Sequence, residues 1–479
     1  MRFYSTKNSC QAFSFAEAVL SGLAPDGGLF IPQAIPPYRE NVKNSLHSMS
    51  LPEIAFETIR PFVTGEIPDP VLEELCAGAF SFSAPLVPVN PDLDKPFSEP
   101  ALMELFHGPT AAFKDFGARF MARTFSFLCR GEDRPIHILV ATSGDTGGAV
   151  ADGFFGVPNI SVTILYPKGR VSELQEKQIA GLGGNISALA VEGSFDDCQA
   201  LVKGAFTDQH LREQLALSSA NSINISRLIP QAVYYAATAG KAQSGRCDSD
   251  GEATPRTGSH YHTIADKEIE PISGNNHPIT FCVPSGNFGN LTAGLYAMSM
   301  GAPIAGFIAA TNINKTVPDY LESGEYKTRL SQATISNAMD VGAPSNFERM
   351  AAHWNHAELR QMIQGVFVTD DETRQSIKDV HHNYGYYLDP HGAVGWTAVQ
   401  KLKAIASGSS TATSGNIADA NKVIVAATAH PAKFSETVES ITGPAPVPAA
   451  IEKALSRTAQ SITIPAELTA LRDFLLSEK

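Results

Sequence analysis

Closely spaced cysteines are missing from this chain of 479 residues. No two of the six cysteines form a C-x-x-C pair, and they stand far apart: Cys10, Cys76, Cys129, Cys198, Cys247 and Cys282. A zinc site or a disulfide framework needs cysteines at short or regular spacings. The sequence therefore predicts neither, and reduced thiols of this kind are typical of a cytoplasmic protein.

Long apolar runs and basic runs are also missing. A membrane-spanning helix needs about 20 consecutive apolar residues. The uncharged stretch from Pro271 to Asn314 is interrupted by Gly, Pro and Asn, so it predicts a buried strand, loop and helix instead. The net charge is -13, and no cluster of Lys and Arg offsets it. We therefore expect no membrane and no nucleic acid among the partners of this chain.

The composition fits a globular protein of several domains. Hydrophobic residues make up 43% of the chain and charged residues 18%, and the length suffices for two or more domains with an ample core. The N-terminal segment MRFYSTKNSCQAFSFAEAVL has no apolar core of a secretory signal peptide, so secretion is not expected. It lacks acidic residues before Glu17, which is a weak feature of organellar transit peptides.

The order of patterns predicts a small helical unit followed by alternating strands and helices. Over the first ninety or so residues, turns such as LAPDGGLFIP separate helical stretches such as Leu51 to Thr58. From Pro135, the β-rich runs IHILVATSG, ISVTILYP and ISALAVEG alternate with the helical runs DTGGAVADGF, SELQEKQIAGLGG and FDDCQALVKGAF. Ser172 and Gln175 have the spacing of a capping box. The alternation indicates right-handed βαβ units and a parallel sheet.

Two polar tracts interrupt this order. The tract from Ser244 to His277 is rich in Gly, Ser and Asp and has no apolar period, so it predicts a surface insertion or a flexible loop. The tract from Ala406 to Asn421 separates a helical stretch from the apolar strand KVIVAATA.

One lysine stands in an apolar setting. In HGPTAAFKDFGARF, Lys114 follows a Gly-Pro turn and lies between Phe113 and Phe116, next to Asp115. It is either a surface lysine beside a phenylalanine-rich core helix or a desolvated lysine whose amine can be neutral and nucleophilic. This stretch alone does not decide between the two.

A glycine-rich turn between a strand and a helix is a candidate phosphate site. In PITFCVPSGNFGNLTAGLYAMSMG, an apolar strand ends at Val283, the turn from Pro284 to Asn290 follows, and a helix then begins. This arrangement presents free backbone N–H groups and the positive end of a helix to an anion. A simple tight connection has the same composition, so the pattern alone is as consistent with an ordinary turn.

A second strand–turn–helix junction carries polar side chains. In ATSGDTGGAVADGF, Ser143, Asp145 and Thr146 lie where a helix begins. Groups at this position can receive a carboxylate, because the helix N-terminus attracts negative charge. They are also the residue types that serve as ordinary N-caps.

An arginine among polar residues follows in ANSINISRLIPQ. Arg227 stands among Asn221, Ser222 and Asn224, and its guanidinium is suited to clamp a second phosphate with two hydrogen bonds. The stretch alone favours an ordinary capping loop with a solvated arginine.

Signatures of other enzyme classes are missing. No G-x-G-x-x-G follows a strand, and the only Gly-Lys pair precedes Ala242 rather than Ser or Thr, so neither nucleotide fingerprint is present. His381-His382 and the histidine of DPHGAVG lack the H-E-x-x-H spacing of a zinc site. No G-x-S-x-G elbow supports a hydrolase triad.

Five stretches, in their order along the chain, resemble the threonine synthase family: HGPTAAFKDFGARF, ATSGDTGGAVADGF, NSINISR, VPSGNFGN and ATAHPAKF. This is a family of pyridoxal-phosphate (PLP) enzymes of fold type II, in the tryptophan synthase β-like group. The opening YSTKNS…FAEAVLSGLAPDGGLFIP and the late stretch YLDPHGAVG resemble that family as well. The resemblance covers nearly the whole chain apart from the polar tract that begins at Ser244.

The resemblance implies roles for particular residues. Lys114 matches the lysine that forms the Schiff base with PLP and acts as the catalytic base. Cofactor binding is implied for Lys114, Gly286, Asn287, Phe288, Gly289, Asn290 and Thr428. Substrate binding is implied for Ser143, Asp145, Thr146, Asn221, Ser222 and Arg227. Many fold-type-II relatives carry Asn where Asp145 stands, facing the ring oxygen of the cofactor, so the sequence does not set the protonation state of Asp145.

The resemblance also implies the architecture. We expect an α/β protein with two open, twisted, mainly parallel sheets flanked by helices, plus a small N-terminal, mainly helical domain. The implied ranges are 1–90 for that domain, 91–479 for the catalytic region, about 132–240 for a smaller βαβ subdomain, 91–131 and 278–479 for a larger PLP subdomain, and 244–277 for a low-complexity insertion.

The implied activity is that of a lyase. The family eliminates phosphate from O-phospho-L-homoserine and adds water at Cβ to give L-threonine, the last step of threonine biosynthesis. Cofactor and substrate each bring a phosphate, and the chain offers two separate candidate sites. The implied partner is a small-molecule substrate, and the implied assembly is a monomer or a homodimer.

Three other functions fit parts of the pattern. A serine/threonine dehydratase on the same scaffold needs no second phosphate clamp, so NSINISR argues against it. A threonine-synthase-like protein without turnover would show damage at the lysine or the clamp, and neither is damaged. A regulatory phosphate-binding module does not explain the setting of Lys114.

Overall fold

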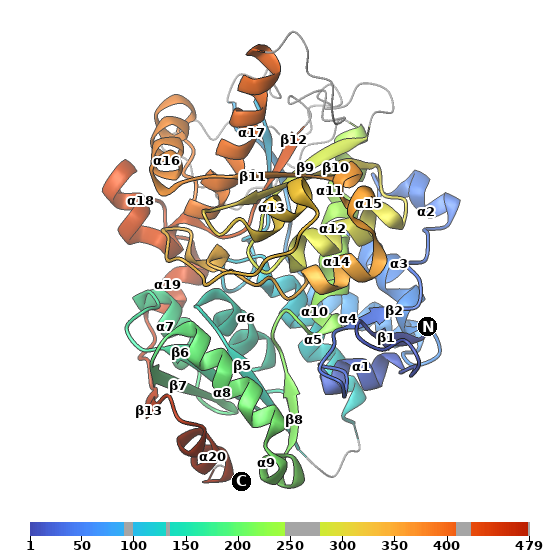
Figure 1. Ribbon diagram of the computed structural model, residues 1–479, viewed down its shortest axis with the longest axis vertical. Helices are drawn as coiled ribbons and strands as arrows, with labels where there is room; N and C mark the ends of the chain where they lie inside the picture. Colours follow the sequence, from blue (N-terminus) through green and yellow to red (C-terminus); the bar gives the residue numbers. More distant parts are fainter. Residues whose placement is uncertain (91–98, 131–134, 245–277, 409–422, 478–479) are drawn as a thin grey trace.

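The computed structural model describes residues 1–90, 99–130, 135–244, 278–408 and 423–477. Within these ranges, a six-stranded sheet and a five-stranded sheet form two separate α/β layers, the first in the upper half of Figure 1 and the second in the lower half. The tract predicted from Ser244 to His277 lies outside the described residues except for Ser244, which ends a helix. The fold class predicted from the sequence is confirmed.

The N-terminal unit is mainly helical and carries a two-stranded antiparallel sheet. It lies beside both layers (blue in Figure 1). Its elements are β1 (Phe3–Ser5), α1 (Phe15–Ser21), β2 (Phe30–Pro32), α2 (Glu40–Ser45), α3 (Leu51–Val63) and α4 (Asp69–Ala79). A strand at Leu86–Pro88, inside the predicted range 1–90, already belongs to the six-stranded sheet.

The larger sheet is parallel except at one edge, where β3 pairs antiparallel with β4. Its strands, in spatial order, are β11 (Ile363–Phe367), β10 (Ile304–Thr311), β9 (Ile279–Pro284), β12 (Val423–Ala427), β4 (Ala101–Glu104) and β3 (Leu86–Pro88). β9, the loop after it, α12 (Gly289–Ser299) and β10 form the buried strand, loop and helix expected in the uncharged stretch.

Strict alternation of side chains explains why helices cover both faces of this sheet. In β9, Phe281 and Val283 enter the core shared with α11 (Ala232–Ser244) and α12, whereas Cys282 enters the core of the opposite face. That opposite core contains residues of α16 (Asp370–Tyr384) and α17 (Pro390–Gly408). Because successive side chains of a strand point to opposite faces, strands buried on both faces must be largely apolar, as β9 is apart from Thr280.

The second sheet is wholly parallel, with the order β13 (Ile462–Pro465), β7 (Ile186–Glu192), β6 (Ile160–Pro167), β5 (Ile136–Ala141) and β8 (Ala216–Ser219). One face packs on α5 (Lys114–Leu128), α6 (Asp145–Phe154) and α7 (Glu173–Ala180). The other face packs on α8 (Phe195–Thr207), α9 (Gln209–Gln214) and α20 (Leu468–Ser477). The predicted strands and helices after Pro135 all occur, and Ser172 and Gln175 form the predicted capping box of α7.

The remaining elements connect the two layers or surround their ends. They are α10 (Ile225–Leu228), η1 (Ile229–Gln231), α13 (Thr316–Ser323), η2 (Asn337–Met339), α14 (Phe347–His353), α15 (His356–Met362), η4 (Pro431–Phe434), α18 (Ser435–Thr442) and α19 (Ala449–Leu455). α17 runs to Gly408, so the polar tract predicted from Ala406 begins within a helix, and its residues from 409 lie outside the described part of the chain. No helix in the described ranges is long and apolar enough to cross a membrane.

Candidate active site

A cavity of about 700 Å³ opens where strands of both sheets end. It is lined by Ala141 at the end of β5, by Pro284 at the end of β9 and by Thr428 just after β12. Ligands of open α/β sheets bind at the carboxyl ends of the strands, so this is the expected place for a site. All the residues to which the sequence assigned cofactor or substrate binding line this one cavity.

Lys114 is the first residue of α5 and lines the cavity. The segment before it is tied to the exit of β12, because Phe113 N–H donates to the carbonyl of Thr428 at 2.9 Å and His430 N–H donates to the carbonyl of Ala111 at 3.1 Å. Ala111 has a positive φ of 55°, a conformation that costs energy for a residue with a side chain and that occurs preferentially at functional sites. The chain therefore fixes the start of α5 firmly against the cavity.

The amine of Lys114 lies in a desolvated setting. The side chain is 16% exposed, its Nζ lies 3.7 Å from Oδ2 of Asp145, and the ring of Phe113 lies 4.9 Å away. Burial lowers the pKa of Lys114, and the charges of Lys433 and Arg227 lower it further, against the opposing effect of Asp145. Of the two settings that the sequence left open, this is the desolvated one.

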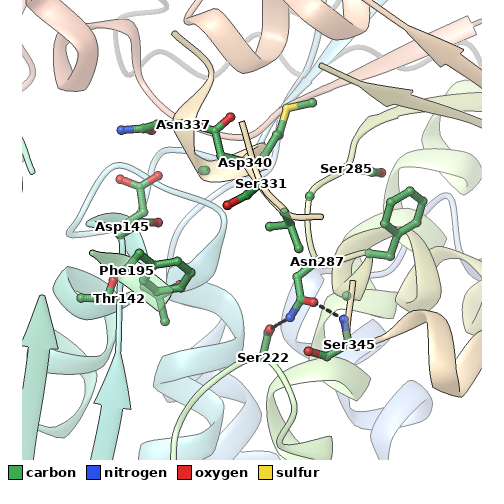
Figure 2. Close-up of a pocket in the computed structure, with 18 of the residues that line it drawn as sticks. Thr142, Asp145, Phe195, Ser222, Ser285, Asn287, Ser331, Asn337, Asp340 and Ser345 are labelled. Atoms are coloured by element: carbon green, nitrogen blue, oxygen red, sulfur yellow. Dashed lines mark hydrogen bonds between the residues drawn. The ribbon is translucent and has the colours of Figure 1, made fainter. Parts of the chain in front are cut away.

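The glycine turn after β9 is held from both sides. Asn287 Nδ2 donates to Ser222 Oγ at 2.6 Å, and its Oδ1 accepts from Ser345 N–H at 2.5 Å; Figure 2 shows both bonds. A Cβ at Gly286 would lie 2.6 Å from the carbonyl oxygen of Ala338, so only glycine fits there. Phe288, just before α12, has a positive φ of 59°. The turn is a preformed, strained cradle at a helix N-terminus.

An unpaired donor completes this cradle. Oδ1 of Asn290 accepts hydrogen bonds from the hydroxyls of Tyr234 and Tyr235, whereas its Nδ2 is buried and has no partner in the described part of the chain. A buried N–H group without a partner is costly, so such a group indicates a missing acceptor. A phosphate oxygen at the N-terminus of α12 is an acceptor of the right kind.

The three residues proposed as a substrate clamp differ in their contacts. Asn221 is bonded to the backbone of Ala141 through both ends of its amide, with Nδ2 donating to the carbonyl at 2.8 Å. Ser222 bonds to Asn287, as Figure 2 shows. Arg227 is 2% exposed; its Nη1 donates to the carbonyl of Ala220 at 2.7 Å, and its Nε has no partner among the described residues.

Arg227 is therefore the charged member of this group, and it has a buried donor without a partner among the described residues. Burial lowers its pKa to about 10, against the opposing charge of Asp115, so the guanidinium is still ionised at neutral pH. It makes no ion pair with a carboxylate within the described ranges. A buried cation of this kind is stabilised by an anion, and a phosphate group suits its fork of donors.

Asp145 begins α6 and is an anion in this setting. Gly144, with φ of 138°, turns the chain into the helix, and Thr142 Oγ accepts from the N–H groups of Gly144 and Gly147. Burial opposes ionisation of Asp145, but the charges of Lys433 and Lys114 outweigh burial and hold its pKa well below the usual range. Figure 2 places its carboxylate at one side of the cavity.

Further cavity residues were not identified from the sequence. Asp340, beside η2, accepts hydrogen bonds from Thr334, and burial raises its pKa to about 6. His391 Nδ1 lies 2.7 Å from Oδ2 of Asp389, and its Nε2 accepts from Ala338 N–H at 3.3 Å, which anchors η2 to α17. Asp389 and His391 lie in YLDPHGAVG, a stretch already noted in the sequence, but the spacing of these two residues did not indicate a role.

Comparisons with known proteins agree over the length of the chain. Three family models match: "Threonine synthase N terminus" over residues 2–80, "Pyridoxal-phosphate dependent enzyme" over 101–414 and "Threonine synthase, C-terminal" over 393–475. The threonine synthase of Haemophilus influenzae is 40% identical, with 99% of this chain and 100% of that protein covered. The threonine synthase of Escherichia coli (strain K12) is 38% identical, with 100% of both covered.

Solved structures give the same result. The crystal structure of threonine synthase from Escherichia coli matches with a TM-score of 0.81 and covers 100% of both chains. The structure of PLP-bound threonine synthase from Brucella melitensis also has a TM-score of 0.81, at 33% identity, and covers 99% of this chain and 98% of that one.

Proposed function

Because this chain belongs to the threonine synthase family, we propose that its cavity converts O-phospho-L-homoserine and water to L-threonine and phosphate, with Lys114 as the catalytic residue. The enzyme is a PLP-dependent lyase. The observation that carries the residue assignment is the presence of two unpaired buried donors, on Asn290 and Arg227, at the same cavity as a desolvated lysine.

The residues of the cavity fit the cofactor. The turn at Gly286 to Asn290 would hold its phosphate with backbone N–H groups and with the unpaired Nδ2 of Asn290. Lys114 would hold it covalently, and Thr428 would place a hydroxyl at its ring nitrogen. When bound, PLP supplies the electron sink that stabilises negative charge at Cα and Cβ of the substrate.

Lys114 moves protons in this scheme. Its Nζ accepts the proton from Cα and passes it to the substrate phosphate, which later departs as hydrogen phosphate. The amine is then free to accept the proton from Cβ, and it returns that proton to carbon when the product forms. A general base works best when its pKa lies near the working pH, and the burial of Lys114 lowers its pKa in that direction. The neutral form is therefore more populated at Lys114 than at an exposed lysine.

Arg227 and the junction after β5 bind the substrate. Arg227 pairs with the substrate phosphate, which gives its buried guanidinium a counter-ion. Ser143 and Thr146 hold the amino-acid end of the substrate at the start of α6. Asn221 and Ser222 position the loop that carries Arg227, because their side chains are bonded to Ala141 and Asn287.

The position of the cavity between two layers suits a reaction that must exclude water until it is needed. Reactive unsaturated species hydrolyse in open water, so a site between two bodies that close on the substrate protects them. We further propose a cytoplasmic location and a monomeric or homodimeric state.

A product assay tests this function. The purified, PLP-supplemented enzyme is given O-phospho-L-homoserine, and phosphate and L-threonine are measured; in parallel it is given L-threonine, and ketobutyrate is measured. We expect equal amounts of phosphate and threonine in the first reaction and little ketobutyrate in the second. The reverse result would identify a dehydratase instead.

A further inference from the structure

A second lysine, Lys433, lies beneath the cavity. It belongs to η4, the short helix that follows β12, and it is 1% exposed. Its Nζ lies 2.7 Å from the carbonyl oxygen of Thr110, 3.0 Å from Oε1 of Gln178 and 3.0 Å from Oδ1 of Asp145. All three neighbours accept hydrogen bonds, and an ammonium group has three N–H donors and no acceptor. The geometry therefore matches the charged form of Lys433.

Asp145 stands between this lysine and Lys114. Its Oδ1 accepts from Lys433 and also from Nε2 of Gln175 at 3.1 Å, whereas its Oδ2 faces Nζ of Lys114 at 3.7 Å, beyond hydrogen-bond distance. The carboxylate is thus hydrogen-bonded to Lys433, whereas its ion pair with Lys114 is the longer of the two. A buried carboxylate with a single cationic neighbour would instead draw that neighbour into a tight ion pair.

We propose that Lys433 is a positioning residue that neutralises Asp145, so that Asp145 does not hold Lys114 as an ammonium ion. This inference rests on the role of Lys114 in the proposed function. Lys433 does not touch the substrate in this arrangement. It sets the charge balance around the lysine that does.

The other charged groups near Lys114 and Asp145 shift the pKa values of these two residues in the directions that the inference requires. Arg227 on α10 acts on Lys114 as a second cation and, like Lys433, lowers its pKa. The electrostatic influence of His391 on α17 also favours the anion of Asp145. Asp115 on α5 lies within reach of the charge of Lys433, but its carboxylate is bonded to Thr110. Lys433 is therefore the cation bonded to the carboxylate that faces Lys114.

Amine labelling of the full-length chain without its cofactor tests the inference. Trace acetic anhydride is added over a series of pH values, and mass spectrometry measures acetylation of Lys114 relative to the exposed Lys203. The variants are Lys433→Met and Lys433→Gln, which remove the charge, with Lys433→Arg as the matched control that keeps it.

Removing the charge leaves Lys114 as the nearest cation to Asp145, so its amine should hold its proton more strongly. The midpoint is the pH at which labelling of Lys114 reaches half its maximum. In both neutral variants we expect this midpoint to move to higher pH. At pH values below the parent's midpoint, relative labelling should fall by about threefold or more. The Lys433→Arg chain should label like the parent. An unchanged or faster labelling of Lys114 in the neutral variants overturns the inference, since a purely structural anchor would not slow it.

Asp145→Asn decides the question if neither neutral variant folds. With the anion gone, two cations face each other, and the midpoint for Lys114 should move to lower pH; an unmoved midpoint overturns the inference. Labelling uses neither cofactor nor substrate, so its outcome is separate from that of the product assay.

Discussion

The hydroxyl of Tyr234 lies 2.6 Å from Oδ1 of Asn290, and the hydroxyl of Tyr235 shares that acceptor at 2.8 Å. Burial raises the pKa of both phenols well above the usual value, so both hydroxyls stay protonated and act as donors. The two bonds fix which end of the amide is oxygen. Nδ2 is therefore a hydrogen-bond donor, and no group in the described part of the chain accepts a hydrogen bond from it.

Replacing Asn290 by Ala is expected to weaken PLP binding by about tenfold or more, because a hydrogen bond to a charged group contributes about 1.5–3 kcal/mol. The dissociation constant is measured by fluorescence titration of the cofactor-free chain. Asn41→Ala, at an exposed position on α2, is the matched control and should bind PLP like the parent. Equal affinity in a folded Asn290→Ala chain would remove this amide from the phosphate site.

Lys114→Ala tests the covalent attachment. We expect this variant to fold, to bind PLP weakly and to lose the visible absorbance band that borohydride reduction abolishes in the parent. Turnover should fall about a thousandfold or more, since both proton transfer and covalent attachment are lost. Lys203→Ala, at an exposed lysine, is the control and should keep both the band and the activity. Retained turnover in Lys114→Ala would take the catalytic role away from this residue.

Local motifs predicted much of this site. Lys114, Asp145 and the turn from Gly286 to Asn290 each lie in a contiguous stretch where a strand ends and a helix begins, and such junctions meet at one edge of a parallel sheet. The positions of these side chains follow from backbone geometry within a few residues, so a sequence pattern is enough to place them.

Contacts between distant segments account for what the sequence did not predict. Lys433 stood in a quoted motif, but its role depends on Thr110, Gln178 and Asp145, which come from three other segments. β13 is short and partly exposed, and it becomes a strand by pairing with β7, more than 260 residues earlier. Secondary-structure propensity predicts neither kind of contact, because both depend on tertiary packing.

The same limit applies to Asn221. The sequence assigned it to the phosphate clamp but did not reveal that its amide, just after β8, bonds both backbone groups of Ala141 at the end of β5. A side chain with both ends engaged in this way orients the loop. A polar residue in a functional motif can thus act on the ligand through the backbone it holds.

Arg227→Met is expected to raise the KM for O-phospho-L-homoserine by about 10- to 100-fold while the absorbance of bound PLP stays intact. Methionine is unbranched and apolar, so it fills the buried space without a charge. Steady-state kinetics and the visible spectrum are recorded on the same samples. The KM of Arg227→Lys should lie between that of the parent and that of Arg227→Met, because lysine keeps the charge but lacks the fork of donors. A bleached spectrum in Arg227→Met would place this arginine at the cofactor phosphate instead.

Buried histidine on β5 should make the protein sensitive to acid. His137 is 5% exposed, bonds Thr163 at 2.8 Å, and burial lowers its pKa from 6.5 to about 4. The unfolded chain therefore takes up a proton at His137 more readily than the folded chain does. The contribution of neutral His137 to the unfolding free energy is fully present above pH 6.5 and is lost as the pH falls toward 4. Between about pH 7.5 and pH 5, His137 alone should cost about 2 kcal/mol of unfolding free energy.

His137→Gln keeps a hydrogen-bonding group but cannot take up the proton, so it should lose less stability over the same range. Urea unfolding of parent and variant at both pH values measures the difference. The half-buried His353 and the buried His430 also have lowered pKa values, of about 4 and about 3, but both chains share them, so their effect cancels in the comparison. His382→Gln, at an exposed position, serves as the control and should follow the parent. An equal loss in the parent and in His137→Gln would mean that the proton reaches His137 in the folded chain, and that β5 is less sealed from water than its burial indicates.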